Sequence, residues 1–122
     1  MYLKRYNENT QPILNVLFYR SANGSEPVRD WLFELPRSAR KSIGEDIKTV
    51  QFGWPLGMPM VRKLEAALWE VRSRIPNGIA RVLITVAGTR MILLHAFIKK
   101  TRKTPAGEFD IARRRLREVQ HG

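Results

Sequence analysis

The sequence predicts a single α+β domain, residues 1–122, in which an antiparallel sheet carries helices packed on one face. Three runs typical of strands follow one another between Leu68 and Lys99, and Asn77-Gly78 separates the first two. An Asn-Gly pair accepts positive φ at both central turn positions, so it is a strong hairpin signal. Segments with helical periodicity stand before and after these runs. The expected order of elements is therefore β-α-α-β-β-β-α.

Before the central strands we expect a tail, one strand and two helices. Residues 1–12 are polar and are interpreted as a loose tail, whereas Ile13–Arg20 is rich in β-branched and aromatic residues and predicts a strand. Pro27 lies in the first turn of the first helix, and Pro36 ends that helix and begins a second one that reaches about Gln51. Apolar residues recur at helical spacing at Val28, Trp31, Leu32 and Leu35 and then at Ala39, Ile43, Ile47 and Val50.

The central strands are predicted at Leu68–Ile75, Ile79–Val86 and Arg90–Lys99, and a last helix at about Ala106–Gln120. That helix carries a strip of apolar residues between positions that are mostly arginine. Its apolar positions are Phe109, Ala112, Leu116 and Val119.

The first hairpin can be given a register. If Asn77-Gly78 forms the loop, Arg74 lies opposite Arg81. Because opposed like charges destabilise a sheet pair, an anion bound there would explain the arrangement; alternatively, both arginines turn into solvent at the hairpin end. Alternation along the strands places Trp69, Val71, Val82, Ile84 and Val86 on one face, and Glu70, Arg72, Arg74 and Arg81 on the face away from the helices.

Charge narrows the class of partner. Lysine and arginine number 22 against 11 acidic residues, a net charge of +11. Such an excess favours a polyanion, with nucleic acid first and an acidic protein second. There is no cysteine for disulfides or thiolate metal sites, and no apolar run approaches the roughly 20 residues of a membrane span. The start of the chain lacks the apolar segment of a signal peptide, so we expect a cytoplasmic protein without membrane contact.

Two stretches carry a resemblance to a known family. They are Leu68-Trp69-Glu70-Val71-Arg72 and the run His95-Ala96-Phe97-Ile98-Lys99-Lys100-Thr101-Arg102-Lys103-Thr104-Pro105. Together with Arg81-Val82-Leu83, they resemble the phage-derived HigB-like branch of the RelE toxin superfamily. The resemblance implies a RelE-like microbial RNase fold and the toxin of a type II toxin–antitoxin system. It further implies ribosome-dependent cleavage of mRNA, and silencing by a cognate antitoxin, expected to be a small helix-turn-helix protein.

The residues offer a route for such cleavage. RNA is cut when its own 2′-OH attacks the adjacent phosphate, and the protein must orient that attack, offset the phosphorane charge and handle protons. Arg72, Arg74 and Arg81 supply cations with donor geometry suited to phosphate. Conventional bases are few, namely Glu70, His95 and lysines whose pKa is depressed by cationic neighbours, such as Lys99, Lys100 and Lys103.

The place of His95 depends on the turn at Ala87-Gly88-Thr89. A loop of two residues would put His95 opposite Val82 on the apolar face, and a loop of three would put it opposite Arg81 on the basic face. His95 is therefore either a packed core residue or a catalytic one, and the sequence leaves both readings open.

Predicted catalytic residues are Arg72, Arg74, Arg81, His95 and Lys99, and predicted RNA-binding residues are Arg62, Lys63, Lys100, Arg102, Lys103, Arg113 and Arg114. No cofactor and no metal are expected, because Glu65 and Glu70 are five positions apart and would point to opposite faces of a strand. Two alternatives remain from the sequence. One is a basic nucleic-acid- or ribosome-binding module without turnover, such as a degenerate toxin, and the other is a basic face that mainly holds an acidic antitoxin.

Overall fold

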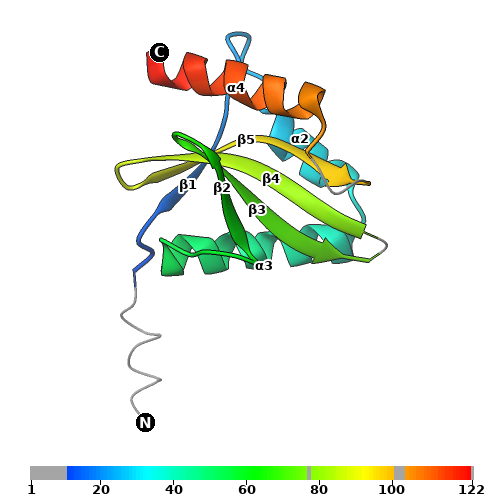
Figure 1. Cartoon of the computed structure of the whole chain (residues 1–122). Coiled ribbons are helices and arrows are strands. Elements are labelled where there is room, and N and C mark those ends of the chain that lie inside the picture. The colour runs from blue at the N-terminus through cyan, green and yellow to red at the C-terminus, as the bar shows by residue number, and fades with distance from the viewer. Residues whose placement is uncertain (1–10, 77, 101–103, 122) are drawn as a thin grey trace.

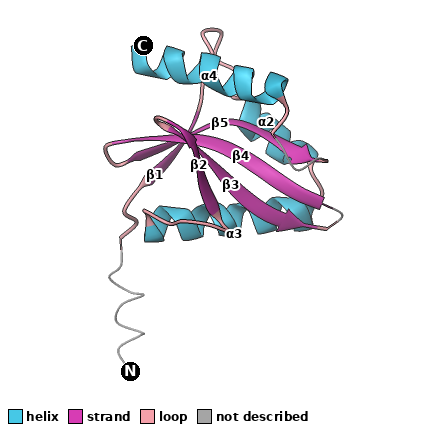
Figure 2. Cartoon of the chain, viewed as in Figure 1, coloured by secondary structure: helices cyan, strands magenta, loops and turns pink. Residues whose placement is uncertain are grey.

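The computed structural model describes residues 11–76, 78–100 and 104–121, and it forms a five-stranded sheet with helices on both faces (Figures 1 and 2). The strand order in the sheet is β1-β5-β4-β3-β2. The elements are β1 Asn15–Phe18, α2 Pro27–Glu34, α3 Arg37–Gly53, β2 Val61–Glu65, β3 Leu68–Ile75, β4 Gly78–Ala87, β5 Arg90–Lys99 and α4 Ala106–His121.

The predicted α+β class is confirmed, and the helices and central strands lie close to their expected positions. Two details of the sheet differ. Residues Val61–Glu65, for which no strand was predicted, form a strand of their own that pairs antiparallel with β3. The first strand pairs parallel with β5, so the sheet is mixed rather than wholly antiparallel.

The expectation that the helices pack on one face is wrong. Helices α2 and α3 cover the face that carries Val71, Val82 and Ile84. Helix α4 crosses the opposite face (Figure 1), where its apolar residues Ala112 and Leu116 join a second core. The sheet residues of that second core include Leu68, Leu83, Ile92, Leu94 and Phe97. The apolar strip of the last helix therefore packs on the face for which only charged residues, Glu70 and three arginines, had been predicted.

The predicted register of the first hairpin is wrong by two residues, although the predicted faces hold. Arg72 pairs with Arg81, and Arg74 pairs with Ile79. The strands resume at the pair Ile75–Gly78, so Pro76 belongs to the loop instead of facing Ile79. Proline has no N–H to give to a ladder and favours the second position of a turn, while glycine favours the fourth. Because a shift of two preserves alternation, the arginines keep their face.

Candidate functional site

Four cations lie on the α4-side face of the sheet, beyond the part that α4 covers. Arg62 of β2 pairs with Glu70 of β3, and in the next row Arg72 pairs with Arg81 of β4. Lys99 of β5 pairs with Ile79 one row further on. Opposed residues and alternate residues share a face, so these side chains converge from four neighbouring strands. We call Arg62, Arg72, Arg81 and Lys99 the cation cluster.

A buried carboxylate organises the cluster. Glu70 is fully buried, and its Oε1 accepts a hydrogen bond of 2.6 Å from Nη1 of Arg81, whose side chain is only 8% exposed. Its other oxygen, Oε2, accepts 2.9 Å from the hydroxyl of Thr104, just before α4. Both oxygens of Glu70 are thus occupied, which suits the residue to holding Arg81 in place and not to removing a proton.

Two guanidinium atoms at the centre of the cluster have no protein partner among the described residues. These are the buried Nε atoms of Arg72 and Arg81, the two residues that face each other across β3 and β4. A buried N–H without an acceptor costs free energy. These two atoms have almost no accessible surface, so it is the opposed positive charges of the two guanidinium groups that favour an anion with several oxygens. A phosphate group has this charge and these acceptors.

Lys99 lies at the edge of the cluster. Its pKa is lowered, first by burial and next by the positive charge of Arg81, with smaller effects of the same sign from Arg62 and Arg72. The negative charge of Glu70 partly opposes them. The sequence had suggested a lowered lysine pKa through Lys100 and Lys103. The cations that lower it among the described residues stand on other strands, and Lys103 lies outside those residues. A lysine in this environment deprotonates more readily than a solvated one.

His95 lies on the basic face, but not because of the length of the loop between β4 and β5. Ala87 pairs with Arg90, so the loop has two residues, but a bulge at Leu94 shifts the ladder and places His95 opposite Leu83. Its Nε2 is 2.6 Å from Oε1 of Glu108 in α4, and its ring stacks on Phe97. Arg115 of α4 donates to the carbonyl oxygen of Leu94 at the bulge. His95 thus contacts α4, and its predicted catalytic role stays a prediction.

The other predicted residues divide into three groups. Arg74 is exposed on the cluster's face, diagonal to Arg81 rather than opposite it, and Lys100 is exposed at the end of β5. Lys63 points to the other face, where its Nζ is 5.7 Å from the Trp69 ring, so it lies away from the cation cluster and its predicted RNA-binding role stays a prediction.

The third group lies on or near α4. Arg113 donates to both carboxylate oxygens of Glu65 and stacks on Phe109, which commits it to holding α4 on β2. Arg114 is exposed and lines a separate hollow with Tyr19. Arg102 and Lys103 lie outside the described residues.

The argument that Glu65 and Glu70 point to opposite faces is also wrong. A tight connection at Ala67, with φ of +60°, separates them onto β2 and β3, and both face α4. Among the described residues, no group of three histidine or acidic side chains could hold a metal ion.

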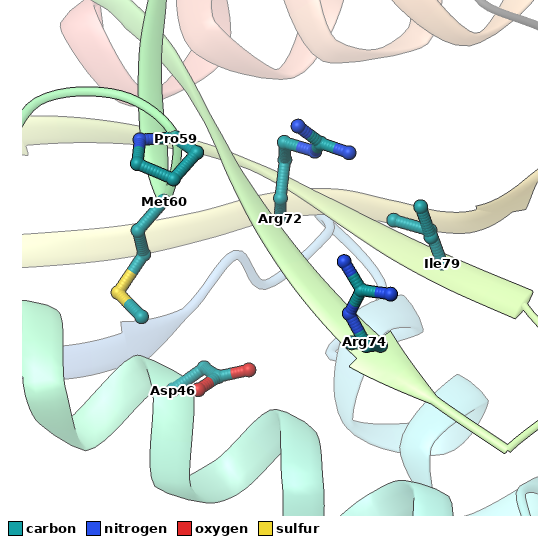
Figure 3. Close-up of a pocket in the computed structure, with 6 residues that line it drawn as sticks. All are labelled: Asp46, Pro59, Met60, Arg72, Arg74 and Ile79. Carbon is teal, nitrogen blue, oxygen red and sulfur yellow. The ribbon is translucent and has the colours of Figure 1, made fainter.

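A pocket of about 250 Å³ opens beside the cluster, at the edge of β3 (Figure 3). It exists because β2 is short. Pairing of β2 with β3 begins at Val61–Val71, and Arg72 donates its backbone N–H to Met60. Beyond Arg72, no strand of the described chain covers that edge of β3. The residues that line the pocket are Asp46, Pro59, Met60, Arg72, Arg74 and Ile79.

Sequence reasoning missed two members of this region. Thr104 was part of the quoted family run but had no assigned role, and Asp46 was one of several polar residues on a helix. The only sequence signal for Asp46 was its place next to the apolar Ile47, which gives no hint of a neighbour on β3.

The family model described as "Phage derived protein Gp49-like (DUF891)" matches residues 30–117. The chain belongs to this family. All four residues of the cation cluster lie in the matched range, and so do Glu70 and Thr104. No curated protein matches the chain. Within the described parts of this Gp49-like protein, no helix has the length and apolar character needed to cross a membrane.

We expect Glu70→Ala to destabilise the fold strongly, because it leaves the guanidinium of Arg81 buried without its counter-ion. Breaking a buried ion pair by removing one partner costs about 3–5 kcal/mol. Denaturant unfolding followed by circular dichroism measures this loss. Glu45→Ala on the exposed side of α3 is the matched control, and it should change the free energy of unfolding by no more than about 0.5 kcal/mol. Equal unfolding midpoints for the two variants would contradict a buried pair.

Proposed function

We propose that this Gp49-like protein is the toxin of a type II toxin–antitoxin system and cleaves mRNA on the ribosome. The observation that carries the proposal is the opposed pair of Arg72 and Arg81 in a cluster of cations built around one buried carboxylate. Such a site fits a phosphate group whose negative charge grows during reaction. The family membership and the resemblance of its motifs to HigB-like toxins support the choice of RNA as the substrate.

The proposed reaction is attack of the ribose 2′-oxygen on the adjacent phosphorus. The bond from the 2′-oxygen to phosphorus forms, the bond from phosphorus to the 5′-oxygen breaks, and a 2′,3′-cyclic phosphate remains on the upstream fragment. Arg72 and Arg81 hold the phosphate oxygens and offset the extra charge of the phosphorane. The departing 5′-oxygen takes a proton from water.

Lys99 in its neutral form is the proposed acceptor of the 2′-hydroxyl proton. Lys99 is itself a member of the cation cluster, whereas the two oxygens of Glu70 hold Arg81 and Thr104 in place and His95 contacts Glu108 of α4. The lowered pKa of Lys99 increases the fraction of neutral amine at a given pH. The amine carries the proton away as ammonium.

The composition of the site supports the proposed dependence on the ribosome. The site has several fixed cations and one weak base. Cleavage at such a site would be accelerated most if the substrate were already held with its 2′-oxygen in line with the departing oxygen. The decoding site is the element that the family resemblance supplies for this purpose.

The deciding assay compares free mRNA with mRNA on programmed ribosomes, each with and without a chelator at a concentration that leaves ribosomes intact. We expect cleavage on ribosomes alone, insensitive to chelator, with a cyclic phosphate end. Arg72→Ala should lower the rate by about 10²–10³-fold, the scale for one preorganised donor, while Arg37→Ala on α3 serves as the control. Efficient cutting of free RNA would refute ribosome dependence. Tight binding to ribosomes without any cutting would favour the binding-module alternative.

The pH dependence of cleavage tests Lys99. Because the neutral amine is the active form, the wild-type rate should rise with pH and level off above a pKa that lies below the ordinary lysine value of 10.5. Lys99→Arg keeps the positive charge but cannot deprotonate, so we expect a loss of about 10²–10⁴-fold and a flat profile. Arg62→Ala removes a charge that lowers this pKa and should move the rising limb to higher pH. A Lys99→Arg profile parallel to that of wild type would exclude the lysine as base.

An antitoxin with an acidic segment is the proposed inhibitor. Arg62, Arg74 and Lys100 are exposed on or beside the cluster's face, so a row of carboxylates could cover them and block the phosphate position. The complex should weaken as salt rises from about 0.05 to 0.5 M, because exposed charge pairs are screened. Titration calorimetry of the purified pair at several salt concentrations measures this, and an affinity independent of salt would argue for an apolar interface instead.

A further inference from the structure

We propose that the pocket at the edge of β3 seats the base next to the scissile phosphate and selects a base with an exocyclic amino group, rejecting uracil. This inference rests on the proposed function, since it assigns a base subsite to the same reaction. The observation behind it is one pocket lined both by the carboxylate of Asp46, which pairs with no described cation, and by two arginines.

The pocket adjoins the phosphate position. Arg72 is both a wall of the pocket and the residue that faces Arg81 in the cation cluster. In Figure 3, Arg72 and Arg74 rise from β3 toward the same side, and Asp46 lies below them on α3. A nucleotide whose phosphate is held by Arg72 and Arg81 would therefore have its base within reach of this pocket.

The size and walls of the pocket suit a flat base. Its volume of about 250 Å³ is somewhat below the roughly 300–1,000 Å³ typical of pockets for drug-sized ligands, which are larger than one base. Pro59, Met60 and Ile79 provide apolar surface for the ring faces, and the guanidinium of Arg74 can stack on the ring or donate to its edge.

Asp46 is set to accept a hydrogen bond from that base. Its Oδ2 accepts 2.6 Å from the hydroxyl of the buried Ser73 in β3, which fixes the carboxylate and leaves Oδ1 for a ligand. No ion pair joins Asp46 to Arg72, Arg74 or any other cation within the described ranges, although it shares the pocket with both arginines. The carboxylate is thus held by a neutral donor and is open to a second one.

The chemistry of the carboxylate gives the selectivity. Adenine, cytosine and guanine each offer an amino group to an acceptor, whereas uracil presents a carbonyl oxygen at the position where cytosine has its amino group. Two acceptors facing each other leave both unpaired in a partly closed site, which is costly. Cytosine and uracil therefore form the matched pair of substrates, because they differ at that one group.

The test uses the full chain and two readouts. In the first, ribosome-bound mRNAs that differ only by C or U at each position of the target codon are cleaved by wild type, Asp46→Asn and the control Glu45→Gln. We expect wild type to prefer C over U by about tenfold or more at one position, the scale of a good base-edge contact. In Asp46→Asn the Ser73 hydroxyl still occupies the oxygen and the amide NH₂ faces the pocket, so the preference should vanish or reverse toward U. Glu45→Gln should keep the wild-type ratio.

The second readout does not need cleavage. Binding of cytidine and uridine 3′-monophosphates to the same three proteins is measured by titration calorimetry, with thermal unfolding to show that each variant is folded. Wild type and Glu45→Gln should bind the cytidine nucleotide several-fold more tightly, and Asp46→Asn should not.

The outcomes separate the two claims. If wild type cleaves no RNA but binds the two nucleotides with the expected ratio, the proposed reaction fails and the base pocket stands. If wild type cleaves with equal rates on C and U at every position, or if Asp46→Asn keeps the ratio of wild type, the base pocket is wrong and the proposed reaction stands.

Discussion

The ion pair between Glu70 and Arg81 is the interaction on which the rest of the site depends. A fully buried carboxylate requires a partner, and Arg81 supplies one at 2.6 Å while Thr104 occupies the second oxygen. The pair lies next to Arg72, Arg62 and Lys99, so one negative charge stands among several positive ones. The fold therefore keeps an excess of positive charge at a fixed place, and a bound phosphate is the partner that would balance it.

Thr104 also connects this charge arrangement to the position of α4. Its hydroxyl donates to Glu70 immediately before the helix begins at Ala106. Further along, Glu108 contacts His95, and Arg113 binds Glu65 on β2. Helix α4 is thus held over the apolar half of its sheet face by polar contacts at several points, and no described helix covers the other half of that face. The same sheet face serves as core under the helix and as the candidate site beside it.

The short strand β2 gives the site its second part. Strand β2 starts at Val61, which pairs with Val71. The residues of β3 after Arg72 therefore have no described strand beside them on that edge. The pocket at this edge is lined by Asp46 of α3 and by Arg72 and Arg74 of β3. Asp46 adds a hydrogen-bond acceptor to a surface that otherwise offers donors. A site with both kinds of group can read a base as well as hold a phosphate, and this distinguishes it from a merely basic surface.

The sequence by itself determined the elements and the faces. Period-2 alternation in β3 and β4 identified which residues share the arginine face, and helical spacing located α2, α3 and α4 closely, because both patterns depend only on neighbours in the chain. Tertiary structure decided what depends on distant partners. The turn chemistry of Pro76 moved the register by two, and the bulge at Leu94 turned His95 to the basic face. Packing of α4 on Leu68 and Leu83 divided the basic face into a core region under the helix and the cation cluster beside it. The pairing of Glu70 with Arg81 and the meeting of Asp46 with Ser73 join residues 11 and 27 positions apart, and no local pattern specifies such contacts.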